Sequence, residues 1–205
     1  SEVLAGISHD LRTPLTRLRL EAELSVSDEA ARAAVIADIE QMEAVISQFM
    51  DYARNNLGEE AVPTDLDALL AALVERQRQR GQVIAYSAET LPEFAVRPRA
   101  LVRAVANLID NALKYGGGEI ALRLSRHPGE VWIEVSDHGP GIPEPEVERL
   151  KRPFTRLDSA RSNVTGTGLG LAIVERIARL HGGRLELLPN PGSGLLARLV
   201  IAGAA

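Results

Sequence analysis

The sequence predicts two structural units, an α-helical hairpin followed by an α+β sandwich. Apolar residues recur at steps of three and four as far as about residue 53, which is the period of helices that bury one stripe. Beyond residue 64, alternating segments typical of strands are mixed with further helical patterns. With 45% hydrophobic and 25% charged residues among 205, the chain has the composition of a folded globular protein. A sheet with helices on one face accounts for the second unit.

The first unit is expected to consist of two helices joined by a short turn. The first runs from the N-terminus to about Ser25, and the turn at residues 27–29 leads to the cap of a second helix that ends near residues 55–58. Each helix has one apolar stripe, so that an isolated hairpin would leave much of it in water. Pairing two hairpins into a four-helix bundle buries both stripes. We therefore expect a homodimer. The stripes consist of Leu4, Ile7, Leu11, Leu15, Leu18 and Ala22, and of Ile39, Met42, Ile46, Phe49 and Ala53.

The second unit is expected to follow a linker over residues 59–64. Glycine, proline and turn residues separate its elements. A long irregular segment from Asp137 to Thr167 interrupts them, and a loop of that length is usually functional or disordered. Helices are predicted over 65–80, 99–115 and from 167 to about 181, and strands over 82–87, 119–125, 130–136, 184–188 and 195–201.

Composition excludes several classes of function. The net charge of −5 and the lack of a lysine or arginine run argue against nucleic-acid binding. The chain has no cysteine, which excludes disulfides and thiolate metal sites. No apolar run approaches the roughly 20 residues that span a bilayer, so we expect no membrane contact by this segment. Because the sequence opens inside a helical pattern, we expect it to be a fragment of a longer protein.

The stretch from Ser8 to Leu15 carries the first candidate chemical group. His9 lies two residues from both Ile7 and Leu11, so a helix directs it away from the apolar stripe and towards solvent. An exposed imidazole beside the carboxylate of Asp10 is available for proton transfer or nucleophilic attack. Thr13 places a hydroxyl one helical turn further on. The alternative, taken from these residues alone, is an ordinary solvated surface.

A second candidate site lies on the helix from residue 99. Asn107, Asn111 and Lys114 are spaced at i, i+4 and i+7, on a stripe different from the apolar one. Two carboxamides on one face can offer oxygens to a hard cation, and a lysine one turn further on can meet a phosphate. A solvated polar face is the alternative for this helix.

The strand that begins at residue 130 ends in an inward-facing acid. Alternation puts Asp137 on the same face as the apolar residues Val131 and Val135, and a buried carboxylate needs a hydrogen-bond donor. The exocyclic amine of a purine could supply it. Gly139 and Gly141 then allow the backbone to turn tightly and to approach a ligand. A simple Asp-Gly turn after a strand is the alternative.

A glycine-rich segment opens the next predicted helix, Gly166-Thr167-Gly168-Leu169-Gly170-Leu171. Glycines before a helix N-terminus expose amides to an anion. The segment lacks the ending of a Walker loop and the spacing of a Rossmann fingerprint, so alone it is weak support. The preceding loop could form a lid whose cations reach a phosphate. The residues of interest in that loop are Lys151, Arg152, Phe154, Arg156 and Arg161.

Together these motifs resemble those of a sensor histidine kinase, over essentially the whole chain. Ser8 to Leu15 is similar to the H box, Asn107 to Tyr115 to the N box, Asp137 to Gly141 to the first glycine box, Pro153-Phe154 to the F box and Gly166 to Leu171 to the second glycine box. Five short motifs in order and at matching spacing make a specific signal. The residues around Thr13 and from Phe154 to Arg161 resemble the EnvZ osmosensor branch most closely. The one departure is His138, where the family more often has Asn or Asp.

The resemblance implies a dimerisation and histidine-phosphotransfer domain at residues 1–57 and a catalytic ATP-binding domain of the Bergerat type at residues 62–205. It implies that His9 attacks the γ-phosphate of ATP, with Asp10 as its base or orienting group, and that Thr13 positions water in a phosphatase reaction. Asn111, with Asn107 beside it, would hold Mg²⁺, and Asp137 would read adenine. The other implied cofactor-binding residues are Lys114, Tyr115, Gly139, Gly141, Phe154, Arg156, Arg161, Gly166, Thr167, Gly168, Leu169 and Gly170.

The function implied is ATP-dependent autophosphorylation of His9 and phosphotransfer to an aspartate of a cognate response regulator. The resemblance also implies phosphatase activity towards that regulator, homodimerisation through the hairpin, and a cytoplasmic position in a protein anchored in the bacterial inner membrane. One alternative is a gyrase- or MutL-like ATPase on the same fold; such enzymes have a glutamate where Asn107 stands. Another is a dimeric, nucleotide-dependent scaffold without histidine phosphorylation.

Overall fold

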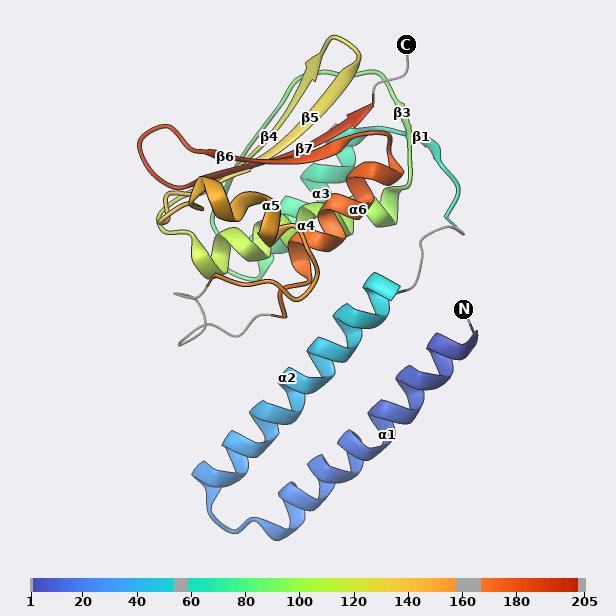
Figure 1. The fold of residues 1–205 in the computed structure, drawn as a ribbon, viewed down its shortest axis with the longest axis vertical. Coiled ribbons are helices and arrows are strands. Elements are labelled where there is room, and N and C mark those ends of the chain that lie inside the picture. The colour runs from blue at the N-terminus through green and yellow to red at the C-terminus, as the bar shows by residue number, and fades with distance from the viewer. Residues whose placement is uncertain (1, 54–58, 158–166, 203–205) are drawn as a thin grey trace.

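The computed structural model describes residues 2–53, 59–157 and 167–202. Its first part is a helical hairpin of α1 (Glu2–Ser25) and α2 (Glu29–Ala53), drawn in blue to cyan in Figure 1. The Asp28 carboxylate accepts a hydrogen bond from the Ala30 N–H at 3.0 Å and so caps α2. Both helices and the cap were predicted from the sequence.

The two helices bury only part of their apolar stripes against each other. The side chains of Leu15, Ala22, Ile39 and Met50 are almost fully covered. Leu18 and Met42, which belong to the same predicted stripes, remain 52% and 50% exposed. Exposed leucine and methionine at helical spacing form an apolar surface that a single copy of the hairpin does not cover.

The second part is a five-stranded sheet with helices on one face, which confirms the predicted α+β sandwich. The strand order is β2-β4-β5-β7-β6; β2 is parallel to β4 and the other neighbours are antiparallel. Figure 1 shows α3, α4 and α6 between this sheet and the hairpin. The strands are β2 (Ile84–Ala88), β4 (Ile120–His127), β5 (Glu130–Ser136), β6 (Arg184–Pro189) and β7 (Leu195–Ala202), and the helices are α3 (Leu66–Gln79), α4 (Pro98–Tyr115) and α6 (Gly170–Leu180).

Alternation along β5 explains how the sheet divides core from surface. Val131, Ile133 and Val135 are at most 2% exposed and belong to the hydrophobic core. The opposite face carries Trp132 and Glu134. Across the sheet, Arg198 of β7 binds the Glu134 carboxylate at 2.8 Å and lies 3.8 Å above the Trp132 ring. Cation–π and ion-pair contacts therefore cover this face, on the side away from the helices.

Two segments differ from the sequence-based expectation. Residues 62–64, predicted as linker, form strand β1 (Val62–Thr64), which pairs antiparallel with β3 (Phe94–Val96). The segment predicted as irregular from Asp137 contains a 3₁₀ turn, η2 (Glu144–Glu146), and the one-turn helix α5 (Val147–Leu150). These four elements, of three or four residues each, are too short to leave a periodic signal. Among the described helices, none is long and apolar enough to cross a membrane.

Candidate functional site

A cavity of about 510 Å³ lies between α4, the ends of β5 and β7, and the segments before and after α5. Ten of the residues predicted to bind a cofactor line it, although the sequence separates them by up to 63 positions. They are Asn107, Asn111, Lys114, Tyr115, Asp137, Gly141, Arg156, Thr167, Gly168 and Gly170. The fold therefore brings most of the predicted site to one place.

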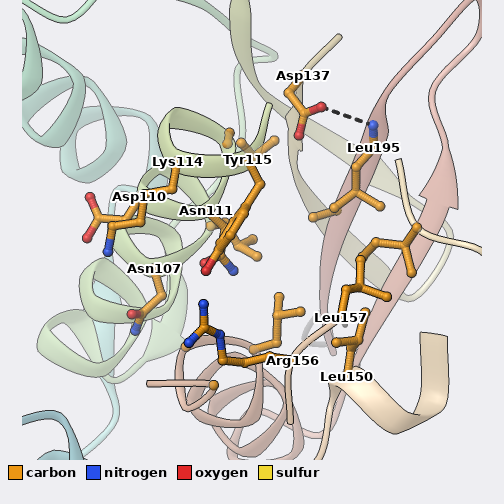
Figure 2. Close-up of a pocket in the computed structure, with 18 of the residues that line it drawn as sticks. Asn107, Asp110, Asn111, Lys114, Tyr115, Asp137, Leu150, Arg156, Leu157 and Leu195 are labelled. Atoms are coloured by element: carbon orange, nitrogen blue, oxygen red, sulfur yellow. Dashed lines mark hydrogen bonds between the residues drawn. The ribbon is translucent and has the colours of Figure 1, made fainter. Parts of the chain in front are cut away.

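Asp137 supplies a buried carboxylate at one end of the cavity. It follows β5, is 6% exposed, and its Oδ1 accepts hydrogen bonds from the N–H groups of Gly139 at 2.9 Å and Leu195 at 3.2 Å. Within the described residues, Oδ2 has no hydrogen-bond donor, and Figure 2 shows this second oxygen pointing towards the cavity. A carboxylate held in this way can accept one further hydrogen bond from a ligand N–H.

Two carboxamides on α4 converge at another part of the cavity wall. Asn107 donates from Nδ2 to the Arg103 carbonyl at 3.1 Å, which leaves its Oδ1 for the cavity. A Cβ atom built on Gly170 would lie 3.5 Å from Oδ1 of Asn111 and 3.6 Å from Oδ1 of Asn107. The two amide oxygens therefore face the same point, at the N-terminus of α6.

This donor set fits a hard cation that is shared with an anionic ligand. Amide oxygens are ligands that Mg²⁺ accepts, usually together with water and phosphate oxygens. In the described part of the chain, no group of three His, Asp or Glu side chains could hold a metal ion without such a ligand. Asn111 and Asn107 would supply the protein side of the coordination.

Positive charge reaches the same region from two elements. Lys114 lies at the C-terminal end of α4, and Arg156 comes from the segment after α5. Figure 2 shows the Arg156 guanidinium directed to the space beside Asn107 and Asn111. The Arg156 carbonyl accepts a hydrogen bond from Arg149 at 3.2 Å, so α5 anchors this segment. Cations, amide oxygens and a helix N-terminus together suit a polyphosphate.

Three predicted cofactor-binding residues lie elsewhere. Gly139 faces Gly116 and holds Asp137 through its N–H rather than lining the cavity. Leu169 is fully buried in the hydrophobic core, where it precedes α6. Phe154 adopts a positive φ of 60° and its ring faces Phe49 of α2.

The remaining predicted residues fall in three groups. Arg161 and Gly166 lie outside the described residues. His9 and Asp10 lie within α1, but their side chains are outside the described part of the structure. Thr13, one turn after His9, is exposed on α1.

The apolar wall of the cavity was not predicted from any sequence pattern. Ile142, Leu150, Leu157 and Leu195 line it, and Figure 2 shows the three leucines opposite the polar residues of α4. Ile142, Leu150 and Leu157 come from the segment predicted as irregular, and Leu195 lies in a predicted strand. An apolar wall facing a few polar groups is the usual composition of a small-molecule binding site.

Two families of known domains match the chain. Residues 1–58 match the His Kinase A (phospho-acceptor) domain. Residues 96–202, about half of the chain, match the histidine kinase-, DNA gyrase B- and HSP90-like ATPase family. The chain belongs to the sensor histidine kinases. The order of the two matches is the order of the hairpin and the sandwich in the fold.

Individual sensor histidine kinases are similar over nearly the whole chain. The sensor histidine kinase GtrS of Pseudomonas aeruginosa is 37% identical over 201 residues, which cover 97% of this chain and 41% of that protein. The histidine-protein kinase/phosphatase MprB of Mycolicibacterium paratuberculosis is 34% identical over 205 residues, covering 91% of this chain and 39% of that protein. The chain thus spans about two fifths of the length of these relatives.

Solved structures share the fold. Full-length ShkA, solved in complex with AMPPNP, superposes with a TM-score of 0.78 at 26% identity, over 100% of this chain and 46% of that one. The kinase domain of the E. coli osmosensor EnvZ has a TM-score of 0.57 at 35% identity, over 74% of this chain and 94% of that one. The predicted resemblance to the EnvZ type is confirmed at the level of the fold and family.

Proposed function

We propose that this chain binds ATP in the cavity, transfers the γ-phosphoryl group to His9 and passes it to an aspartate of a response regulator. The observation that supports this most strongly is the pairing, in one cavity, of a buried carboxylate with an accepting oxygen and two convergent amide oxygens flanked by cations. The buried carboxylate suits a purine amine, and the two amide oxygens with the cations suit a metal-bound polyphosphate. The family to which the chain belongs supports the same function.

In the proposed binding mode, adenine lies against the apolar wall with its amine on Asp137. The phosphates extend towards the N-terminus of α6, where Lys114, Arg156 and the amides around Gly168 neutralise their charge. Arg161 and Gly166 would add to this set. Asn111, with Asn107, would hold Mg²⁺, which neutralises phosphate oxygens when it is bound. Tyr115 lines the same cavity and would pack near the base or the ribose.

The chemical step takes place at His9. A ring nitrogen of His9 attacks the γ-phosphorus, the bond from that phosphorus to the β–γ bridging oxygen breaks, and ADP leaves. Asp10 accepts a hydrogen bond from the other ring nitrogen, and so orients the imidazole and stabilises the positive charge that develops on it. Positioning and charge neutralisation supply most of the rate enhancement.

The partners follow from the two proposed domains. Residues 1–57 would dimerise through the apolar surface that includes Leu18 and Met42, and would present His9 to the regulator. Residues 62–205 would form the catalytic ATP-binding domain. Thr13 would position water for hydrolysis of the phosphorylated regulator, the reaction named for the relative MprB. Because the reaction consumes ATP, we place this region in the cytoplasm, in a protein anchored in the inner membrane.

The first test is incubation of the chain with Mg²⁺ and γ-labelled ATP. The intact chain is expected to acquire acid-labile, alkali-stable label, the stability that distinguishes a phosphorylated imidazole from a phosphoserine. His9→Ala should remove the label because the nucleophile is gone. Asn111→Asp should remove it because the metal–nucleotide site is altered. His127→Gln is the matched control, since His127 stacks on Trp132 on the outer face of the sheet, away from the cavity.

The outcomes separate the proposal from its alternatives. Label that persists in His9→Ala overturns the assignment of the nucleophile. ATP hydrolysis without labelling of the intact chain favours the ATPase alternative. Nucleotide binding with neither labelling nor hydrolysis favours the scaffold.

A further inference from the structure

The loop between β6 and β7 is bound to the segment that carries Asp137. Asn190 donates from Nδ2 to the Asp137 carbonyl at 2.8 Å. Ser193 donates from Oγ towards the carbonyls of His138 and Gly139, at 3.0 and 3.2 Å. A proline- and glycine-rich turn between two strands thus reaches a segment more than 50 residues away in the sequence.

Leu195, which follows this loop as the first residue of β7, also holds Asp137. The Asp137 N–H donates to the Leu195 carbonyl at 3.0 Å, and the Leu195 N–H donates to Oδ1 of Asp137 at 3.2 Å. Gly194 has a φ of 102°, and a Cβ atom there would lie 2.0 Å from the Asp137 carbonyl oxygen, so no larger residue fits without movement. The loop is closed on itself by the hydrogen bond from the Asn190 N–H to the Gly194 carbonyl at 3.1 Å.

These contacts divide the Asp137 residue into a fixed part and a free part. Its N–H, its carbonyl and Oδ1 are all bound by the chain: Asn190 of the loop binds the carbonyl, and Leu195, the first residue of β7, binds the N–H and Oδ1. Only Oδ2 is left to a ligand among the described residues. The direction of Oδ2 therefore depends on the start of β7 and on the loop, because rotation of the carboxylate would break the bond from Leu195, and displacement of the backbone would break the bond from Asn190.

We propose that Asn190 is a positioning residue for base recognition, which acts by holding the main chain of Asp137 so that Oδ2 meets the exocyclic amine of adenine. Ser193 assists by fixing the two residues that follow. This inference rests on the proposed role of Asp137 in reading adenine. Asn190 is suited to the task because its amide donates to a carbonyl oxygen without adding charge next to the carboxylate.

The test is the ability of the protein to discriminate between two nucleotides. ATP carries the exocyclic amine, and purine riboside triphosphate lacks it but is otherwise the same. The ratio of their dissociation constants, measured by calorimetry with Mg²⁺ on the intact chain, reports the hydrogen bond to Asp137. Asn190→Asp replaces the donating amide by an acceptor of the same shape that faces the Asp137 carbonyl. We expect it to weaken ATP binding about tenfold and purine riboside triphosphate binding by less than about twofold.

Two further variants make the result specific. Asp137→Asn should abolish the discrimination, because an amide cannot replace both acceptor oxygens. Gln79→Glu, the same kind of change on the exposed surface of α3, should leave both affinities unchanged. If Asn190→Asp does not fold, Ser193→Ala replaces it, with a smaller expected loss of discrimination of about threefold.

The possible failures are distinguishable. If Asp137→Asn leaves the ratio unchanged, the proposed reading of adenine is wrong, and the inference falls with it. In the other failure, Asp137→Asn abolishes discrimination while Asn190→Asp lowers the affinities for both nucleotides equally, or lowers neither affinity. Either result shows that Asn190 has only a structural role. Loss of ATP affinity alone, in a variant that still binds purine riboside triphosphate normally, supports the inference.

Discussion

The ring of Phe154 lies against the ring of Phe49, with centroids 6.3 Å apart and planes inclined by 32°. Phe49 belongs to α2, whereas Phe154 follows α5 in the segment that supplies Arg156 to the cavity. The pair thus links the helical hairpin to one wall of the candidate ATP site. The contact is partial, because the Phe154 side chain remains 61% exposed.

Phe154 holds this position with a backbone conformation that is unfavourable for its residue type. Its φ of 60° is in the left-handed region, which costs an L-residue roughly 1 kcal/mol relative to glycine. We therefore expect Phe154→Gly to be more stable than Phe154→Ala by about 0.5–1 kcal/mol. Both variants lack the ring, so the difference reports the backbone alone. Urea unfolding measures it, and an alanine variant at least as stable as the glycine variant would contradict the assigned conformation.

Glu59, at the start of the α+β sandwich, is hydrogen-bonded to α4, the helix that carries Asn107 and Asn111. Its carboxylate accepts hydrogen bonds from the N–H groups of Arg99 at 2.8 Å and Ala100 at 3.0 Å, in the first turn of α4. The N-cap residue Arg97 makes no side-chain cap of its own, so Glu59 caps the helix from a distant part of the sequence.

Removal of this cap should destabilise the protein. We expect Glu59→Ala to lower the free energy of unfolding by about 1 kcal/mol, because two N–H groups lose their acceptor and the helix dipole loses a negative charge. The matched control is Glu60→Ala, a change at the neighbouring exposed position. Urea unfolding of the two variants decides: equal stabilities would show that the cap contributes nothing.

The strong local patterns were predictable from the sequence, and the Glu59 contact shows why other features were not. The alternation in β5 and the spacing of Asn107 and Asn111 on α4 are local, and both gave the correct element and placed the side chains on the cavity side. Glu59 falls in the predicted linker, and nothing local marks its contact because its partners lie 40 residues further on. Pairing between distant segments has no periodic signature, which is also why the three-residue strands β1 and β3 were missed.

The residues placed away from the cavity show a second limit. Leu169 and Phe154 stand inside motifs whose neighbours line the cavity, yet Leu169 packs into the core and Phe154 contacts α2. A motif fixes which residues occur together, whereas packing decides which of them face the ligand. Leu169 immediately precedes an amphipathic helix whose apolar face is buried, and a leucine there gains more from burial than from exposure to a polar ligand.

His181 is expected to make stability depend on pH. Its Nε2 accepts a hydrogen bond from the Arg97 N–H at 3.0 Å, so Nδ1 carries the proton and donates to the Ile177 carbonyl at 2.8 Å. Burial lowers the pKa of His181 below its usual 6.5, and the nearby positive charge of Arg97 lowers it further. The bond to Ile177 and the negative charge of Glu59 oppose this shift without cancelling it.

The sign of the effect follows from proton counting. Between the lowered pKa and 6.5, the unfolded chain binds more protons at this position than the folded chain, so its contribution to stability is lost as the pH falls below 6.5. His181→Asn removes the titrating group. We expect unfolding free energies at about pH 7.5 and about pH 5.5 to differ less in this variant than in the unmodified chain. A pH dependence that is unchanged by the substitution would refute the assignment.

Thr13 offers a way to separate the two proposed activities. It lies four residues after His9 on the continuous helix α1, so the helix places both on one face, one turn apart. Transfer to His9 needs the imidazole and ATP, but hydrolysis of a phosphorylated regulator needs a group that orients water beside the docked aspartyl phosphate. Thr13→Ala should therefore leave autophosphorylation within about twofold and reduce phosphatase activity by more than about tenfold.

The structure supplies a matched control on the same helix. Thr16 is also exposed on α1, three residues after Thr13, and its hydroxyl donates to the Arg12 carbonyl at 3.0 Å, a bond within the helix itself. Thr16→Ala should leave both activities unchanged, and Thr13→Ser, which keeps the hydroxyl, should retain most of the phosphatase activity. Both reactions are followed with labelled phosphoryl groups, on His9 and on the regulator. Parallel loss of the two activities in Thr13→Ala would mean that the residue supports the helix or the docking of partners, because a group that only positions water cannot slow the transfer to His9.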